Sequence, residues 1–152
     1  MYKSLSRIGV ALVSWVAAAS GPALAQDATA LARHGDIALA AGFAPDPHEV
    51  TISTGGDLDA AALSSACDGL IGEAPDLRVQ YSAASAPRTP LVVSAQSSAD
   101  ISLLVSAPDG AWYCSTDGLI RFGRPQSGAY AIWVAAPAAA TEAALTLSAT
   151  GP

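Results

Sequence analysis

The stretch GAYAIWVAA, residues 128–136, places large apolar side chains at every second position. In an extended chain Tyr130, Ile132 and Val134 share one face, because successive side chains of a strand point to opposite sides. This period of two is typical of a half-buried strand. The same alternation recurs in other candidate strands, at 36–41, 48–53, 77–82, 90–95, 99–107, 119–122 and 144–149. About eight short strands separated by turns predict an all-β protein, a single antiparallel β-sandwich.

The inward faces of these strands predict the core. We expect burial of Val50, Ile52, Leu77, Val79, Tyr81, Ile101, Leu103, Val105, Ile120, Tyr130, Ile132, Val134 and Leu147. Two Ala-rich stretches, 59–66 and 137–144, have helical propensity instead. The first is too short to be stable alone as a helix. The second begins at a proline between two strands, so we expect a loop there.

The N-terminus predicts export. A basic start with Lys3 and Arg7 precedes an apolar run at 8–19, and small residues follow up to Ala25. This pattern is typical of a secretory signal helix cleaved after residue 25. The alternative is a membrane anchor, although the run is shorter than the ~20 apolar residues a span needs. We expect a periplasmic or secreted protein with a flexible leader at 26–34 and a sandwich domain at 35–152.

The charge balance is acidic. The chain has 7 basic and 13 acidic residues, for a net charge of −6. Loss of Lys3 and Arg7 with the signal would leave five basic residues and a net charge of −8. Such a chain repels nucleic acid and anionic membranes. Because the acids are scattered, they indicate a solvated surface rather than a dedicated cation-binding face.

The chain contains two cysteines, Cys67 and Cys114. In an exported protein they most simply form a disulfide with each other. Closing a loop of roughly 48 residues would stabilise the fold by about 4 kcal/mol in the chain-entropy model. The alternative is a catalytic or redox thiol, but neither cysteine belongs to a CxxC motif.

Catalytic residues are hard to find in this sequence. A serine-peptidase triad needs a histidine base, and the available ones are His34, in the leader, and His48, at a strand entrance. The sequence lacks a GxSxG nucleophile elbow. We therefore predict no catalytic residues and no enzyme activity, with a secreted hydrolase as a distant alternative.

Metal ligation is weakly indicated. Calcium prefers several carboxylates and carbonyls in one loop, and Asp57 and Asp59 alternate in GGDLD. The competing interpretation is that each Asp shapes its own turn. We therefore predict no metal site and no cofactor, and keep a calcium-stabilised module as the second hypothesis.

Several ordered motifs resemble a known family. GDIALAAGFAPDPHEV, SAPDGAWYC and PQSGAYAIWV together resemble small exported bacterial proteins related to the bacterial pre-peptidase C-terminal (PPC) domain. The resemblance covers about residues 35–149. It implies a jelly-roll-like β-sandwich, a Cys67–Cys114 disulfide and a non-enzymatic module of the kind carried by secreted proteases.

The loops around the cysteines are the candidate binding region. They carry aromatic and charged side chains of the kind that dominate binding energy, namely Asp68, Asp109, Trp112, Tyr113 and Asp117. We expect these residues to meet at one end of the sandwich and to contact an exported protein or a cell-surface polymer. The competing interpretation is that Trp112 and Tyr113 only cover the disulfide.

Overall fold

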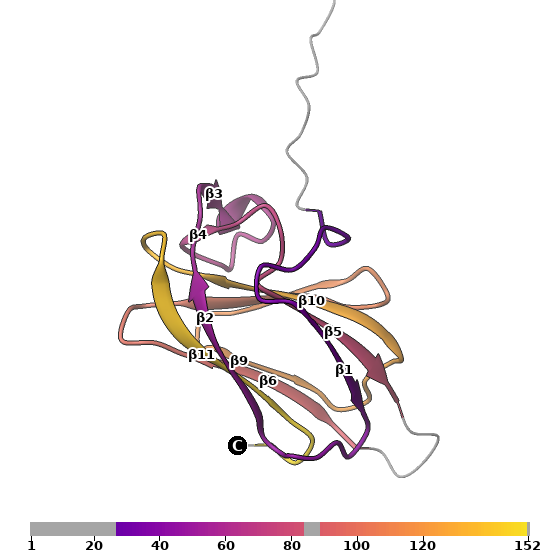
Figure 1. Ribbon diagram of the computed structural model, residues 1–152. Coiled ribbons are helices and arrows are strands. Elements are labelled where there is room, and N and C mark those ends of the chain that lie inside the picture. Colours follow the sequence, from indigo (N-terminus) through magenta and orange to yellow (C-terminus); the bar gives the residue numbers. More distant parts are fainter. Residues whose placement is uncertain (1–26, 84–88, 152) are drawn as a thin grey trace, which may run out of the picture.

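The computed structural model describes residues 27–83 and 89–151, and the expected signal segment lies outside this part. The described chain is almost entirely strands and turns, with a single short 3₁₀ helix (Figure 1). The elements in chain order are β1 (Asp36–Ala40), β2 (His48–Thr54), β3 (Leu58–Asp59), η1 (Ala60–Ala62), β4 (Leu70–Ile71), β5 (Leu77–Ser82), β6 (Leu91–Gln96), β7 (Ser102–Ser106), β8 (Trp112–Ser115), β9 (Leu119–Phe122), β10 (Gly128–Ala135) and β11 (Thr141–Ser148).

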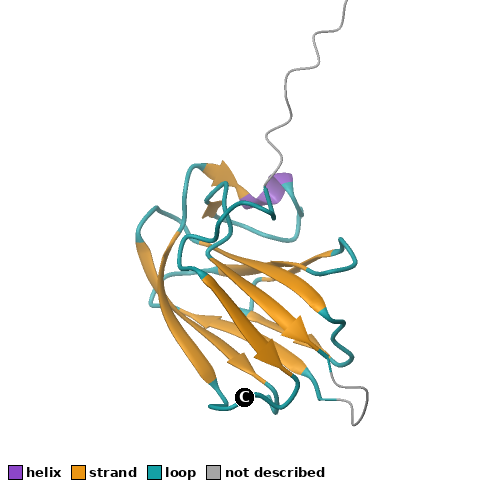
Figure 2. Ribbon diagram, turned by 45° about the vertical axis from the view of Figure 1, so that its right-hand side comes forward, coloured by secondary structure: helices purple, strands orange, loops and turns teal. Residues whose placement is uncertain are grey.

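Two sheets pack face to face, which confirms the predicted all-β class (Figure 2). One sheet has the strand order β1-β5-β10-β7-β8 and the other β2-β11-β6-β9. Neighbouring strands are antiparallel except β1 and β5, which are parallel. The exception follows from topology, since the chain crosses to the second sheet as β2 before it returns as β5.

The core lies between the two sheets, largely where the alternation places it. Eleven of the predicted core residues are buried, and the other two, Val50 and Ile101, are partly buried against the same cluster. The stretch 137–144 is only half a loop, because residues 141–144 already pair with β2 as the start of β11. Backbone pairing with a neighbouring strand thus overrides the helical propensity of this Ala-rich stretch.

A second, smaller core covers the outer face of the five-stranded sheet. Trp133 is fully buried there, on the side of β10 that faces away from the sandwich interior. The segment 55–75, with β3, η1 and β4, supplies the other side of this cluster. Ala131 and Ser102, which the alternation places on an outer face, are consequently 3% exposed. Much of this sheet therefore offers no open surface to a ligand.

Residues 27–34 differ from the expected flexible leader. The buried guanidinium of Arg78 donates hydrogen bonds to the carbonyls of Ala28 and Ala30. Arg78 also lies 3.4 Å from the carboxylate of Asp36. A charge buried beneath the segment needs these acceptors, and the segment is held against the sheet as a result.

Candidate functional site

The structure confirms the disulfide between Cys67 and Cys114, whose Cα atoms are 6.0 Å apart. Cys114 lies in β8 and Cys67 in the loop between η1 and β4. Cys67 belongs to the same buried cluster as Trp133, against which Trp112 packs with ring centroids 5.1 Å apart. The disulfide therefore fastens the segment 55–75 to an edge strand of the five-stranded sheet.

The predicted binding residues do not meet at one end of the sandwich. β7 and β8 form a hairpin in which Ser106 pairs with Trp112 and Leu103 with Ser115. Asp109 lies in the turn of this hairpin, whereas Asp117 follows the opposite end of β8. The sequence interpretation treated residues 112–115 as part of a loop, but they form a strand, and strands extend about 3.4 Å per residue.

Asp68 lies at the Asp117 end. It lines an open hollow of about 330 Å³ together with Asp100, Ser102 and Thr116. Its backbone N–H donates to the Ser102 hydroxyl at 3.3 Å. This hollow contains no aromatic side chain, so half of the predicted constellation lies apart from Tyr113.

Tyr113 occupies the other end and is exposed. Its side chain is 38% accessible, and it is the only exposed aromatic residue in 27–83 and 89–151. Its ring packs edge-on against Phe122 (centroids 5.0 Å apart), and Phe122 packs in the same way on Tyr130 (5.1 Å). The Tyr130 hydroxyl accepts from the Gln126 N–H at 2.9 Å and donates to the Gln126 carbonyl at 3.0 Å. The exposed ring is thus supported by a row of rings that ends in the core.

A small hollow lies beside this row. Its volume is about 50 Å³, and its lining includes Asp109, Tyr113, Phe122, Arg124, Gln126 and Tyr130. We call these six residues the aromatic edge. They come from β8, β9, β10 and two turns, because edge strands of both sheets, β8 and β9, lie beside each other here.

Arg124 differs from the arginines in the body of the sandwich. Arg33 lies 3.1 Å from the carboxylate of Asp76, and Arg78 is paired with Asp36. Arg124 is exposed, and none of the described carboxylates lies within the 4.0 Å of an ion pair. The guanidinium therefore has donors available to a ligand.

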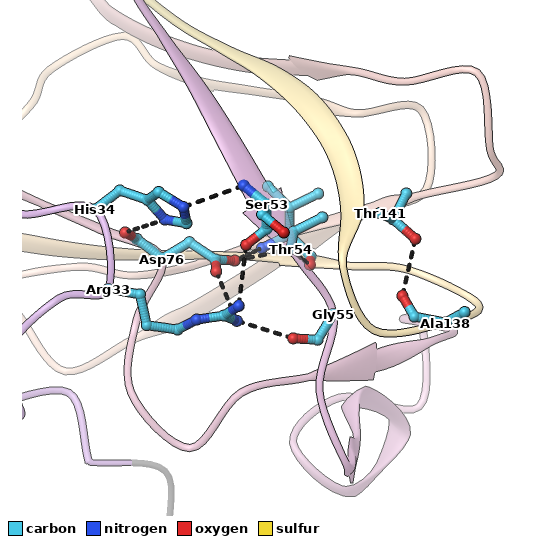
Figure 3. A network of polar contacts seen from close by, with 9 residues as sticks. Arg33, His34, Ser53, Thr54, Gly55, Asp76, Ala138 and Thr141 are labelled. Carbon is cyan, nitrogen blue, oxygen red and sulfur yellow. Dashed lines mark hydrogen bonds and ion pairs between the residues drawn. The ribbon is translucent and has the colours of Figure 1, made fainter.

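A buried polar network joins the two sheets on the other side of the molecule (Figure 3). Its centre is Asp76, just before β5, whose Oδ2 accepts from the Thr54 hydroxyl (2.9 Å) and from the Val134 N–H (2.8 Å). Thr54 belongs to β2 and Val134 to β10, so one carboxylate oxygen connects the two sheets. We call Arg33, His34, Ser53, Thr54 and Asp76 the polar clamp.

Arg33 and His34 complete the clamp. Arg33 donates to the carbonyls of Ser53 (3.0 Å) and Gly55 (2.8 Å). His34 accepts the Ser53 N–H at Nε2 (3.1 Å) and lies 3.2 Å from the Asp76 carbonyl through Nδ1. Both residues were expected in a solvated leader. Sequence reasoning missed this role because the partners come from segments about 20 and 40 residues away.

The Asp76 carboxyl is costly to bury in its charged form. Burial raises its pKa above the usual 3.8, although the Val134 N–H, the Thr54 hydroxyl, Arg33 and His34 act in the opposite direction. Oδ1 faces Arg33 but has no aligned hydrogen-bond donor among the described residues. The network satisfies this charge only in part.

The histidine contacts do not form a catalytic triad. A backbone N–H can only donate, so Nε2 of His34 must be the acceptor and Nδ1 the protonated nitrogen. A general base needs a free nitrogen toward its nucleophile, and this one is occupied by Ser53. Among the described residues, no serine hydroxyl is hydrogen-bonded to His34 or His48. The geometry offers no nucleophile–base pair.

The calcium candidates serve local structure. The Asp59 carboxylate accepts the Ala61 N–H at 2.9 Å and caps η1. Asp57 is exposed at the rim of a cleft of about 360 Å³, which also contains Arg33 and Glu73. Within 27–83 and 89–151, no three His, Cys, Asp or Glu side chains converge as metal ligands would.

Comparisons with known proteins add little to this geometry. The sequence matches no family model and no curated protein. Among solved structures, the chain resembles Aeromonas hydrophila PliG, a periplasmic inhibitor of g-type lysozyme. The TM-score is 0.38 with 18% identity, over 74% of this chain and 96% of that one. So weak a likeness carries no conclusion about function. In the described part of the chain, none of the helical segments could span a membrane.

Proposed function

We propose that this protein is a non-enzymatic, exported binding module that docks on another exported protein through its aromatic edge. The observation that carries the proposal is Tyr113, an exposed aromatic ring held in place by Phe122 and Tyr130. Binding energy at protein interfaces concentrates in Tyr, Trp and Arg. A ring that is already fixed before binding also loses little conformational entropy.

The location of the residues favours this edge over the two larger hollows. Tyr113 and Arg124 lie together on turns and edge strands of a rigid sandwich, where binding residues commonly sit. The hollow at Asp68 and the cleft at Asp57 are larger, but neither has an aromatic lining. The proposal keeps Asp109 and Tyr113 from the predicted binding loop. It leaves Trp112, which packs on Trp133, in a structural role.

Export and the absence of catalysis are part of the proposal. A disulfide persists in oxidising compartments such as the periplasm or the extracellular space. The resemblance to PPC domains, which accompany secreted proteases, also supports a module that assists another exported protein. A cell-surface polymer is the alternative partner, and no cofactor is required.

Capture from the organism's own exported fraction tests the proposal. Wild-type mature protein and the Tyr113→Ala and Leu31→Ala variants would be immobilised, and the retained proteins identified. Leu31 is a matched control, because it is an exposed apolar residue (84% accessible) outside the aromatic edge. We expect a protein that wild type and Leu31→Ala retain and Tyr113→Ala loses. Equal retention by all three would overturn the aromatic edge as the binding surface.

A further inference from the structure

The hollow in the aromatic edge has the size of one side-chain end. Its volume is about 50 Å³, whereas sites for small molecules have roughly 300–1,000 Å³. A sugar ring or a cofactor therefore does not fit, but the terminal group of a single side chain does. This argument favours a partner protein over a polysaccharide, since a protein can insert one side chain between Tyr113 and Arg124.

The polar groups of the hollow select the chemistry of that side chain. The Asp109 carboxylate already accepts the Ala111 N–H of its own turn at 3.0 Å through Oδ1. The Gln126 backbone is occupied by the Tyr130 hydroxyl. Arg124 is the strongest donor without a described partner. A guanidinium binds a carboxylate through two parallel hydrogen bonds, more strongly than it binds a neutral acceptor.

We propose that the hollow beside Arg124 receives an aspartate or glutamate side chain of the partner protein, with Tyr113 packing against the apolar stem of that side chain. The inference rests on the proposed function and names the partner chemistry. The surface charge sharpens it. In a chain with a net charge of −6, a general attraction for acids is absent, so recognition depends on the local contact with Arg124.

A carboxylate probe tests the hollow without the partner. Propionate and its neutral analogue propionamide would be titrated into isotopically labelled mature protein at constant ionic strength, with the arginine side-chain NMR signals as readout. Arg121 is the internal control, because it is also exposed but does not line the hollow. We expect saturable shifts at Arg124 with propionate, little change with propionamide, and none at Arg121.

Two variants and a sugar separate the outcomes. Arg124→Gln should abolish the propionate response, and Arg124→Lys should weaken it. If Arg121 responds as Arg124 does, or if saturable shifts occur only with a neutral oligosaccharide, the inference is wrong.

The captured partner distinguishes this inference from the proposed function. Arg124→Gln should lower its affinity at least about tenfold, the effect of one charged hydrogen bond. A partner that Tyr113→Ala loses and Arg124→Gln retains fully would remove the carboxylate inference and leave the proposed function standing.

Discussion

The two sides of this sandwich solve the same structural problem differently. On the β1–β2 side, the polar clamp joins the sheets through Asp76, whose side chain is completely buried. On the β8–β9 side, a short turn and a row of aromatic rings join them, and Tyr113 stays exposed. Polar groups that are tied up inside a protein stabilise it, whereas rings and charges left at the surface are available to a ligand. Charged residues alone would therefore have been a poor guide to the binding surface.

The largest expected effect comes from the covalent link beside the aromatic edge. Replacing both Cys67 and Cys114 with Ser should lower the free energy of unfolding by about 4 kcal/mol, because the unfolded chain regains the freedom of a long loop. Urea unfolding of the oxidised wild type and the double variant measures this. A loss below about 1 kcal/mol would mean that the second core holds the segment 55–75 without the bond.

Breaking the polar clamp should be nearly as costly. Asp76→Ala leaves the Val134 N–H, the Thr54 hydroxyl and the Arg33 guanidinium without their acceptor. We expect a loss of about 3 kcal/mol, the low end for removing one member of a buried ion pair, because the Arg33 side chain is 34% exposed. Asp57→Ala, at an exposed site, is the control. Equal stability of the two variants would show that the clamp does not hold the sheets together.

The pH dependence of stability should sharpen the contrast between the clamp and the surface. Because burial raises the pKa of Asp76 above 3.8, the folded state binds this proton more tightly than the unfolded state. The free energy of unfolding contributed by this group therefore falls as pH rises through the interval between the two pKa values. On acidification from about pH 7 to about pH 4, wild type should gain stability relative to Asp76→Asn. A constant difference between them, with Asp57→Asn as reference, would contradict the raised pKa.

The aromatic edge should tolerate change with little effect on stability. Tyr113→Ala removes a ring that is partly in water, so the free energy of unfolding should fall by about 1 kcal/mol or less. Phe122→Ala is the contrasting variant, since Phe122 is partly buried and packs against Tyr130, and it should cost more. Thermal unfolding of both would reveal a structural role for Tyr113 if the order were reversed.

The sequence predicts the strands better than it predicts which surfaces are open. Alternation identified Tyr130, Ile132 and Val134 as core residues because a strand has a fixed period. The burial of Trp133 on the other face depends on the segment 55–75, whose position comes from long-range packing. The roles of His34 and Asp76 likewise depend on contacts between distant segments.

The candidate site was predictable in part for the same reason. Asp109 and Tyr113 are close in sequence, and the turn chemistry identified them. Phe122 and Arg124 belong to the other sheet and the turn after it, and only the packing of β8 beside β9 brings them to Tyr113. The predicted convergence with Asp68 and Asp117 failed because residues 112–115 extend as a strand.

The central claim is that the aromatic edge binds while the polar clamp only stabilises. The most direct test measures the affinity for the captured partner by calorimetry, together with the unfolding temperature, for Tyr113→Ala and His34→Ala. The account predicts that Tyr113→Ala loses at least about tenfold in affinity and little in stability, a truncated hot spot. It predicts the reverse for His34→Ala, since the clamp loses its contact with Ser53. Unchanged affinity for Tyr113→Ala, or an equal loss for both folded variants, would contradict the account.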